Sequence, residues 1–147
     1  MVAISFWAFL YFLSYIRLMK SLPNIGLLVL RCTFSFMLFF NHGYSKLVHF
    51  SEISRNFPNP IGMGSAWSAG LVVFAEAIMS AFVFFGLYTR LASIPIIINM
   101  GVAALVFHSG DPISKSELAY LYLASFVAIA TLGPGTYSLD SKLRRVN

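Results

Sequence analysis

The stretch WSAGLVVFAEAIMSAFVFFGLY, residues 67–88, carries a single charged side chain, that of Glu76. An α-helix of about 20 mostly apolar residues is long enough to cross a bilayer. We therefore predict a membrane-spanning helix here, with one carboxyl group inside it. An ionised carboxylate in hydrocarbon is strongly unfavourable unless it is paired or hydrated, so such residues are usually functional. Glu76 is the first candidate site residue.

Three further stretches have the same character. Residues 91–107 and 118–133 carry no charge, and residues 21–45 carry only Arg31. Across the 147-residue chain 59% of the residues are hydrophobic and 10% are charged, whereas soluble domains carry about a quarter charged residues. We predict an all-α integral membrane protein, a four-transmembrane-helix bundle with an additional N-terminal apolar helix.

Three regions are expected along the chain. Residues 1–24 form a membrane-associated N-terminal helix, because residues 2–16 are apolar but short for a crossing and lack the flanks of a signal peptide. Pro23 and Asn24 are expected to end this helix. Residues 25–140 form the four-helix domain, and residues 141–147 form a basic tail.

Polar residues fall on one stripe in each of the first two spans. At 100° per residue, Ser35 and His42 share a face with Arg31 and Lys46, and Ser80 shares a face with Glu76. We predict a polar seam through the bundle, with Arg31, Ser35 and Ser80 along it and His42, Lys46 and Glu76 in one half. Small residues in the second span, among them Ala69 and Ala77, predict close helix packing there.

Three interpretations of Glu76 remain open at this point. It is a protonated carboxyl in an interhelical hydrogen bond, a partner of Arg31, or a proton-relay or ligand-binding group. Arg31 lies about six residues into its span and Glu76 about eleven, an offset of roughly 8 Å at 1.5 Å per residue. That offset disfavours the direct pair without excluding it.

The third and fourth spans supply further candidates for the same site. Asn99 lies near mid-depth and His108 at the end of the third span, nine residues apart, which in a regular helix means opposite faces. Glu117 completes the sequence Ser114-Lys115-Ser116-Glu117, which predicts a capping box at the start of the fourth span. The candidate polar site comprises His42, Lys46, Glu76, Asn99, His108 and Glu117.

Metal and haem sites are not expected. His42 and His108 should lie at similar depth, but no HxxxH pair or carboxylate cluster accompanies them. The single cysteine, Cys32, excludes an internal disulfide, a CxxC pair and a cysteine-ligated cluster within this chain.

Seven motifs occur in an order that resembles the DoxX family of small four-helix membrane proteins. They are LLVLR, NHGYSKL, FAEAIMS, GLYTRL, INMGVAALVFHSGDP, KSELAYLYL and LGPGTYSLD, spread over about residues 25–140. The family is related to the membrane subunit of an archaeal thiosulfate:quinone oxidoreductase, and a mycobacterial member is associated with a membrane oxidoreductase complex. Distant eukaryotic relatives act in receptor assembly or cargo handling.

The resemblance implies a membrane subunit of a redox system that binds quinone or another lipophilic partner. No redox cofactor is expected within the chain, so electron carriers would belong to other membrane or redox subunits, and a homo-oligomer is compatible with the sequence. The alternatives are a non-enzymatic scaffold or assembly factor, and a path for protons or small solutes along the seam. Nucleic acid is not an expected partner, because the net charge of +5 comes mainly from residues at span ends that face lipid headgroups.

The distribution of Lys and Arg predicts the topology. One side of the membrane receives Arg17, Lys20, Arg90, Lys142, Arg144 and Arg145, and the other receives Lys46, Arg55 and Lys115. Because cytoplasmic loops carry the excess of basic residues, both termini should be cytoplasmic if residues 2–16 do not cross. We expect a multi-pass protein of a bacterial or archaeal cytoplasmic membrane.

This topology can be tested by cysteine labelling in a Cys32→Ala background. Cysteines at Asn59 and Asp111 should react with an impermeant reagent outside intact cells, and one at Asn147 should react only after permeabilisation. The reverse pattern would contradict the charge rule for this chain.

Overall fold

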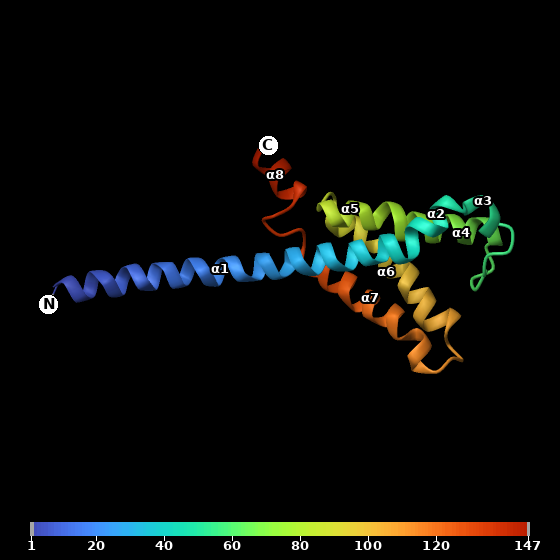
Figure 1. Cartoon of the computed structure of the whole chain (residues 1–147), viewed down its shortest axis with the longest axis horizontal. Coiled ribbons are helices and arrows are strands. Elements are labelled where there is room, and N and C mark those ends of the chain that lie inside the picture. The colour runs from blue at the N-terminus through green and yellow to red at the C-terminus, as the bar shows by residue number, and fades with distance from the viewer. Residues whose placement is uncertain (1, 147) are drawn as a thin grey trace.

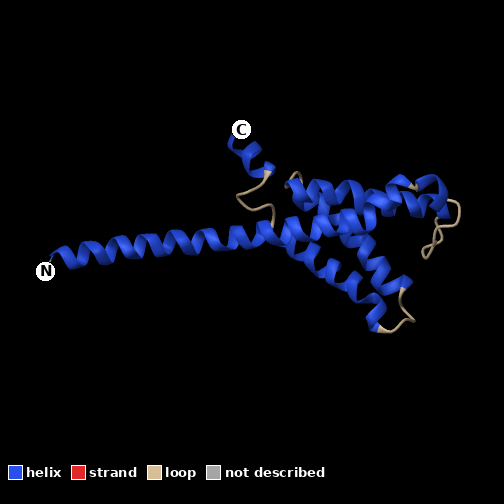
Figure 2. Cartoon of the chain, viewed as in Figure 1, coloured by secondary structure: helices blue, strands red, loops and turns tan. Residues whose placement is uncertain are grey.

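The computed structural model describes residues 2–146 and is helical, with no strand in that range (Figures 1 and 2). Four helical stretches are long and apolar enough to cross a membrane: Ser21–Val48, Ser65–Phe85, Thr89–Phe107 and Ile113–Leu132. The predicted class, an all-α membrane protein with four spans, is confirmed.

The first span belongs to a longer helix, α1 (Val2–Leu38), which continues through η1 (Phe39–Gly43) and α2 (Tyr44–Val48). The predicted end of the N-terminal helix at Pro23 is wrong, because α1 contains Pro23 in its interior. A proline costs a helix one hydrogen bond, and membrane helices tolerate this loss when neighbours compensate. Asn24 serves as an anchor, since its Oδ1 accepts a hydrogen bond from the Thr136 amide at 3.1 Å.

The 37 residues of α1 would span about 55 Å at 1.5 Å per residue, more than the roughly 30 Å of a hydrocarbon core. The N-terminal part of α1 accordingly extends beyond the other helices (Figure 1). The expected boundary at residue 24 is therefore not a break in the helix.

The other spans are also built from α and π segments. The second comprises α4 (Ser65–Val73), η2 (Phe74–Met79) and α5 (Ser80–Phe85), and the third comprises α6 (Thr89–Val102) and η3 (Ala103–Phe107). The fourth is α7 (Ile113–Leu132), and α8 (Leu139–Val146) ends the described chain. The short α3 (Phe50–Ile53) begins the connection between the first two spans.

The start of α7 differs from the prediction. The helix begins at Ile113, after Pro112, and no side chain caps it. Ser114 therefore lies inside the helix, and Glu117 is exposed. The predicted capping box is wrong because the proline moved the start of the helix one residue before Ser114.

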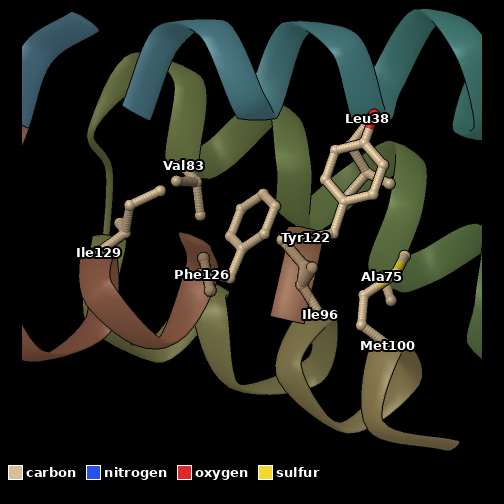
Figure 3. Close-up of a cluster of buried hydrophobic side chains, with 9 residues drawn as sticks. Leu38, Ala75, Val83, Ile96, Met100, Tyr122, Phe126 and Ile129 are labelled. Carbon is tan, nitrogen blue, oxygen red and sulfur yellow. The ribbon is translucent and has the colours of Figure 1, made fainter. Parts of the chain in front are cut away.

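A compact apolar core fills the half of the bundle near the Gly86–Tyr88 turn. Val83, Ile96, Phe126 and Ile129 are fully buried in it and come from α5, α6 and α7, with Leu38 of α1 packed beside them (Figure 3). We call this half the hairpin end, and the opposite half, which carries the loops at residues 54–64 and 108–112, the cavity end.

The hairpin end is held by the segment that follows α7. Arg31 is buried and donates two hydrogen bonds to backbone carbonyls, from Nη1 to Pro134 at 2.6 Å and from Nη2 to Tyr137 at 2.7 Å. The Asp140 carboxylate accepts hydrogen bonds from the amides of Tyr88 and Thr89 at 2.7 and 2.9 Å. A carboxylate here satisfies free N–H groups and complements the dipole at the start of α6. These contacts tie α1, α6 and the chain terminus together.

The two π segments η1 and η2 pack against each other at Gly43. A Cβ added at Gly43 would lie 2.8 Å from the Ala77 Cα and closer still to the Glu76 backbone. Only a residue without a side chain allows this approach. The predicted close packing of the second span is also visible at Ala69 and Ala77, which are both buried.

We expect Gly43→Ala to lower the free energy of unfolding by about 1–3 kcal/mol, as overpacked cores do. Gly70→Ala is the matched control, because nothing lies within 4 Å of a Cβ added there, and it should be neutral or slightly stabilising. Unfolding in mixed micelles measures both. Equal effects of the two substitutions would contradict the close contact of η1 with η2.

Candidate functional site

Glu76 occupies the centre of the candidate site. Its side chain lies in η2, and the residue is only 5% exposed. One carboxylate oxygen, Oε2, pairs with the Lys46 ammonium of α2. The other, Oε1, accepts a hydrogen bond from Asn99 Nδ2 of α6 at 3.0 Å. Three of the four spans therefore meet at a single carboxylate, whose two oxygens are both bonded.

The π segment η2 presents this carboxylate to the bundle. A π turn leaves backbone carbonyls without their usual helical partners, and such turns are frequent at functional sites. The Ser80 hydroxyl lies within hydrogen-bond distance of two of these carbonyls, those of Glu76 at 2.5 Å and Ala77 at 3.1 Å. Ser80 therefore supports the backbone that carries Glu76 and does not contact the carboxylate itself.

His42 lies beside this group in η1 and is half-buried. Its ring meets the ring of Tyr122 edge to face, with centroids 5.7 Å apart. Tyr122 is 2% exposed, and its hydroxyl has no hydrogen-bond partner among the described residues. The contact joins η1 and α7 on one side of the site. Tyr122 was not among the site residues predicted from the sequence.

A cavity of about 550 Å³ opens beside the carboxylate. Its polar residues include Glu76, Lys46, Asn99, His42 and Tyr122, while most of its wall is apolar. The wall residues come from the loop after α3, from α4 and η2, from α6 and η3, and from α7. Ligand sites commonly have volumes of about 300–1,000 Å³, apolar walls and a few placed polar groups.

His108 lines the same cavity further toward the loop at residues 108–112. Its Nδ1 lies 2.9 Å from Asp111 Oδ2, and Lys115 Nζ lies 3.3 Å from Asp111 Oδ1. Hydrogen bonds from His108 and then from Lys115 hold the pKa of the Asp111 carboxyl below its ordinary value. Asp111 therefore stays ionised to lower pH than a free aspartate, and its contacts weaken only as the pH falls through that lowered pKa.

The expectation that Asn99 and His108 face opposite sides is wrong, because both line the cavity. The π segment η3 lies between them, and because a π turn holds more residues than an α turn, the side chains after it point in a different direction than they would on a regular α-helix. Of the six predicted site residues, five line the cavity, and they are His42, Lys46, Glu76, Asn99 and His108. Glu117 does not line it and is exposed on α7.

The predicted seam divides into two parts. Ser35 and Ser80 are fully buried, as the inward stripe requires. Arg31 is buried too, but it binds the carbonyls of Pro134 and Tyr137, so its pairing with Glu76 is excluded as an interpretation. Lys46 is the cationic partner of Glu76 instead. Within residues 2–146, no three His, Cys, Asp or Glu side chains gather as metal ligands would.

The family comparison agrees with this architecture. The DoxX family model matches residues 26–109, more than half of the chain. The chain belongs to the DoxX family. No curated protein and no solved structure matches it. The DoxX match contains the carboxylate and its two partners, whereas Tyr122 and the carbonyls bound by Arg31 lie after it.

In this DoxX protein, removing one member of the Lys46–Glu76 pair should destabilise the fold. Lys46→Met leaves a buried carboxylate without its cation, and we expect a loss of about 1–3 kcal/mol because Lys46 is partly exposed. The double variant Lys46→Met with Glu76→Gln should recover most of that loss, since no uncompensated charge remains.

The matched control is Lys115→Met, which removes the exposed partner of Asp111 and should cost less than about 1 kcal/mol. Unfolding in mixed micelles compares the variants. If Lys46→Met lowered the free energy of unfolding no more than Lys115→Met does, the Lys46–Glu76 pair would not stabilise the fold.

Proposed function

We propose that this DoxX protein is a membrane subunit of a redox system and binds a lipophilic ligand such as a quinone in the cavity beside Glu76. One observation carries the proposal. A buried, charge-paired carboxylate lies in an apolar-walled cavity inside a membrane bundle. Intramembrane ionisable residues that face a cavity commonly mark ligand or proton sites.

The polar groups suit a ligand with hydrogen-bond acceptors. Both oxygens of Glu76 are already bonded, to Lys46 and Asn99. Lys46 has three N–H donors and Asn99 has two, so each retains N–H capacity beyond the bond to Glu76. A ketone or quinone oxygen could accept these bonds in place of water. Cationic or N–H donors would also stabilise negative charge that develops on such an oxygen during reduction.

The polar residues of the cavity are also suited to proton transfer. Glu76 and His42 can each hold or release a proton, and both line the cavity with Lys46. Reduction of a quinone to a hydroquinone takes up two electrons and two protons. In our proposal the electrons come from partner subunits and the cavity residues pass the protons.

Passage of protons or solutes across the whole membrane is a weaker proposal. The hairpin end holds a packed apolar core that includes Val83, Ile96 and Phe126, all fully buried. Arg31 and its carbonyl partners lie beyond that core. These features favour a site that is open on one side only.

A scaffold or assembly role is the second candidate function. The N-terminal part of α1 extends beyond the bundle and exposes Phe12, Tyr15 and Met19 (Figure 1). Such a surface could contact another membrane protein.

We place the protein in a bacterial or archaeal cytoplasmic membrane with both termini cytoplasmic, which would put the cavity in the outer half of the bilayer.

The test is purification in a mild detergent, followed by mass spectrometry of bound lipids, quinones and proteins. Bound quinone or redox subunits would support the proposal, and a client membrane protein with an empty cavity would favour the scaffold.

Affinity for an added quinone should then fall about ten- to hundredfold in Glu76→Gln, because the carboxylate holds Lys46 and Asn99 in the orientation in which they donate to the ligand, and a hydrogen bond from a charged group contributes about 1.5–3 kcal/mol. His42→Ala combined with Glu76→Gln should cost little more than the worse single variant, since neighbouring groups that share a function are non-additive. Glu117→Gln, an exposed carboxylate on α7, is the control and should bind normally. Wild-type affinity in Glu76→Gln would refute the site.

A further inference from the structure

The cavity beside Glu76 is bounded on three sides by different parts of the chain. Toward the hairpin end, the apolar core that includes Ile96 and Phe126 fills the bundle. On the side of η1 and α7, the His42 and Tyr122 rings are in contact. These two boundaries leave the membrane surface at the cavity end and the face between α4 and α6 as routes for a ligand.

The loop after α3 covers part of the route from the membrane surface. Phe57, Pro58, Pro60 and Ile61 all line the cavity. Asn59 anchors the loop to α4, because its Oδ1 accepts a hydrogen bond from Ser68 Oγ at 3.1 Å. This apolar cover disfavours water and polar solutes beneath the loop, while His108 and the exposed Lys115 line the cavity at the same end.

The fourth face lies between α4 and α6. Near the hairpin end the second and third spans pack together through α5, η2 and α6, whereas α4, which η2 continues, packs mainly against α3. The α6–α7 pair accordingly diverges from α4 toward the cavity end (Figure 1). Leu71, Phe74 and Ile98 line the cavity at this divergence and are 47%, 41% and 61% exposed.

The depth of this face in the bilayer determines whether lipid chains or headgroups surround it. Leu71 and Phe74 lie six and nine residues after Ser65, the first residue of α4, or roughly 9 and 14 Å along the helix axis. Ile98 lies nine residues before Phe107, the last residue of η3, at a matching depth. All three therefore lie at the level of the lipid chains, given a hydrocarbon core of about 30 Å.

We propose that Leu71, Phe74 and Ile98 form a lateral portal through which a single-tailed lipophile enters from the bilayer. Its oxygen-bearing head binds at Lys46 and Asn99, and its isoprenoid or alkyl tail lies across the portal into the lipid. The volume of about 550 Å³ holds a ring head and the first part of a tail, while the rest stays in the bilayer. This inference rests on the proposed function for the nature of the head, but the route of entry stands independently.

The route is tested by spin labels in a Cys32→Ala background in lipid bilayers. A label at Val72, which lines the cavity, is compared with labels at lipid-facing Leu91, at Glu52 in the exposed α3, and at the core residue Val83. Collisions with dissolved oxygen report contact with lipid, and collisions with a water-soluble nickel complex report contact with water. We expect the label at Val72 to behave like the label at Leu91, with a higher collision rate with oxygen than with the nickel complex. Collision rates like those at Glu52 would mean that the cavity opens to water, and low rates with both reagents, like those at Val83, would mean that the cavity is closed. Either result overturns the portal.

The ligand is tested with two quinones that share a head, one with a ten-carbon tail and one without a tail. Leu71→Trp combined with Ile98→Trp narrows the portal, and Ile78→Trp is the control on an exposed position of η2 that does not line the cavity. We expect the double variant to slow the entry of both quinones several-fold, because both heads pass the portal. It should weaken the equilibrium affinity of the tailed quinone alone, because only its tail lies across the portal. Unchanged entry rates would overturn the portal, and equal changes in the two affinities would overturn the assignment of the tail. If the wild-type protein bound neither quinone but the label at Val72 collided with oxygen, the proposal of a quinone head would be refuted and the lateral route would remain supported.

Discussion

The need to satisfy one buried carboxylate constrains the whole cavity end of the bundle. Glu76 lies inside an apolar helix, where an unpaired charge is strongly unfavourable. Lys46 and Asn99 bond its two oxygens from two other spans. The three helices cannot rotate or slide without breaking at least one of these bonds. The same cluster that fixes the helix register also supplies the polar groups of the cavity.

This arrangement depends on close backbone contact and on local departures from α-helical geometry. Gly43 lets η1 lie against the backbone of Glu76 and Ala77, and the π turn of η2 is supported by Ser80. The hairpin end is organised differently, by apolar packing and by Arg31 and Asp140 bound to backbone groups. One half of the molecule is therefore a packed anchor, and the other half is open enough to hold a ligand.

Much of this fold could be predicted because membrane spans follow from composition. Glu76 was recognisable as a lone carboxyl in an apolar helix, and its stripe placed it near Lys46 and His42. Tyr122 carried no comparable signal, because an aromatic residue in the middle of a span is ordinarily part of the core. The partners of Arg31 are backbone carbonyls more than 100 residues away in sequence, and residue types do not encode such contacts.

The remaining errors have local physical causes. Pro23 predicted a helix end, but α1 continues through it. Pro112 shifted the start of α7 and removed the capping box that would have explained Glu117. The π turns altered the faces on which Asn99 and His108 lie, and π turns depend on packing that a single sequence does not reveal.

The central claim, that the Glu76 carboxylate is the polar centre of a ligand site, is tested most directly by isotope-edited infrared difference spectroscopy. Protein labelled with ¹³C-glutamate is compared before and after a quinone analogue is added, in wild type and in Glu76→Gln. Glu52 and Glu117 are exposed and do not line the cavity. A glutamate band that shifts in wild type and not in Glu76→Gln can therefore be assigned to Glu76. Our account predicts that the glutamate carboxyl bands shift on binding in wild type and that this shift is absent in Glu76→Gln. Saturating binding with no change in the glutamate bands would contradict the account.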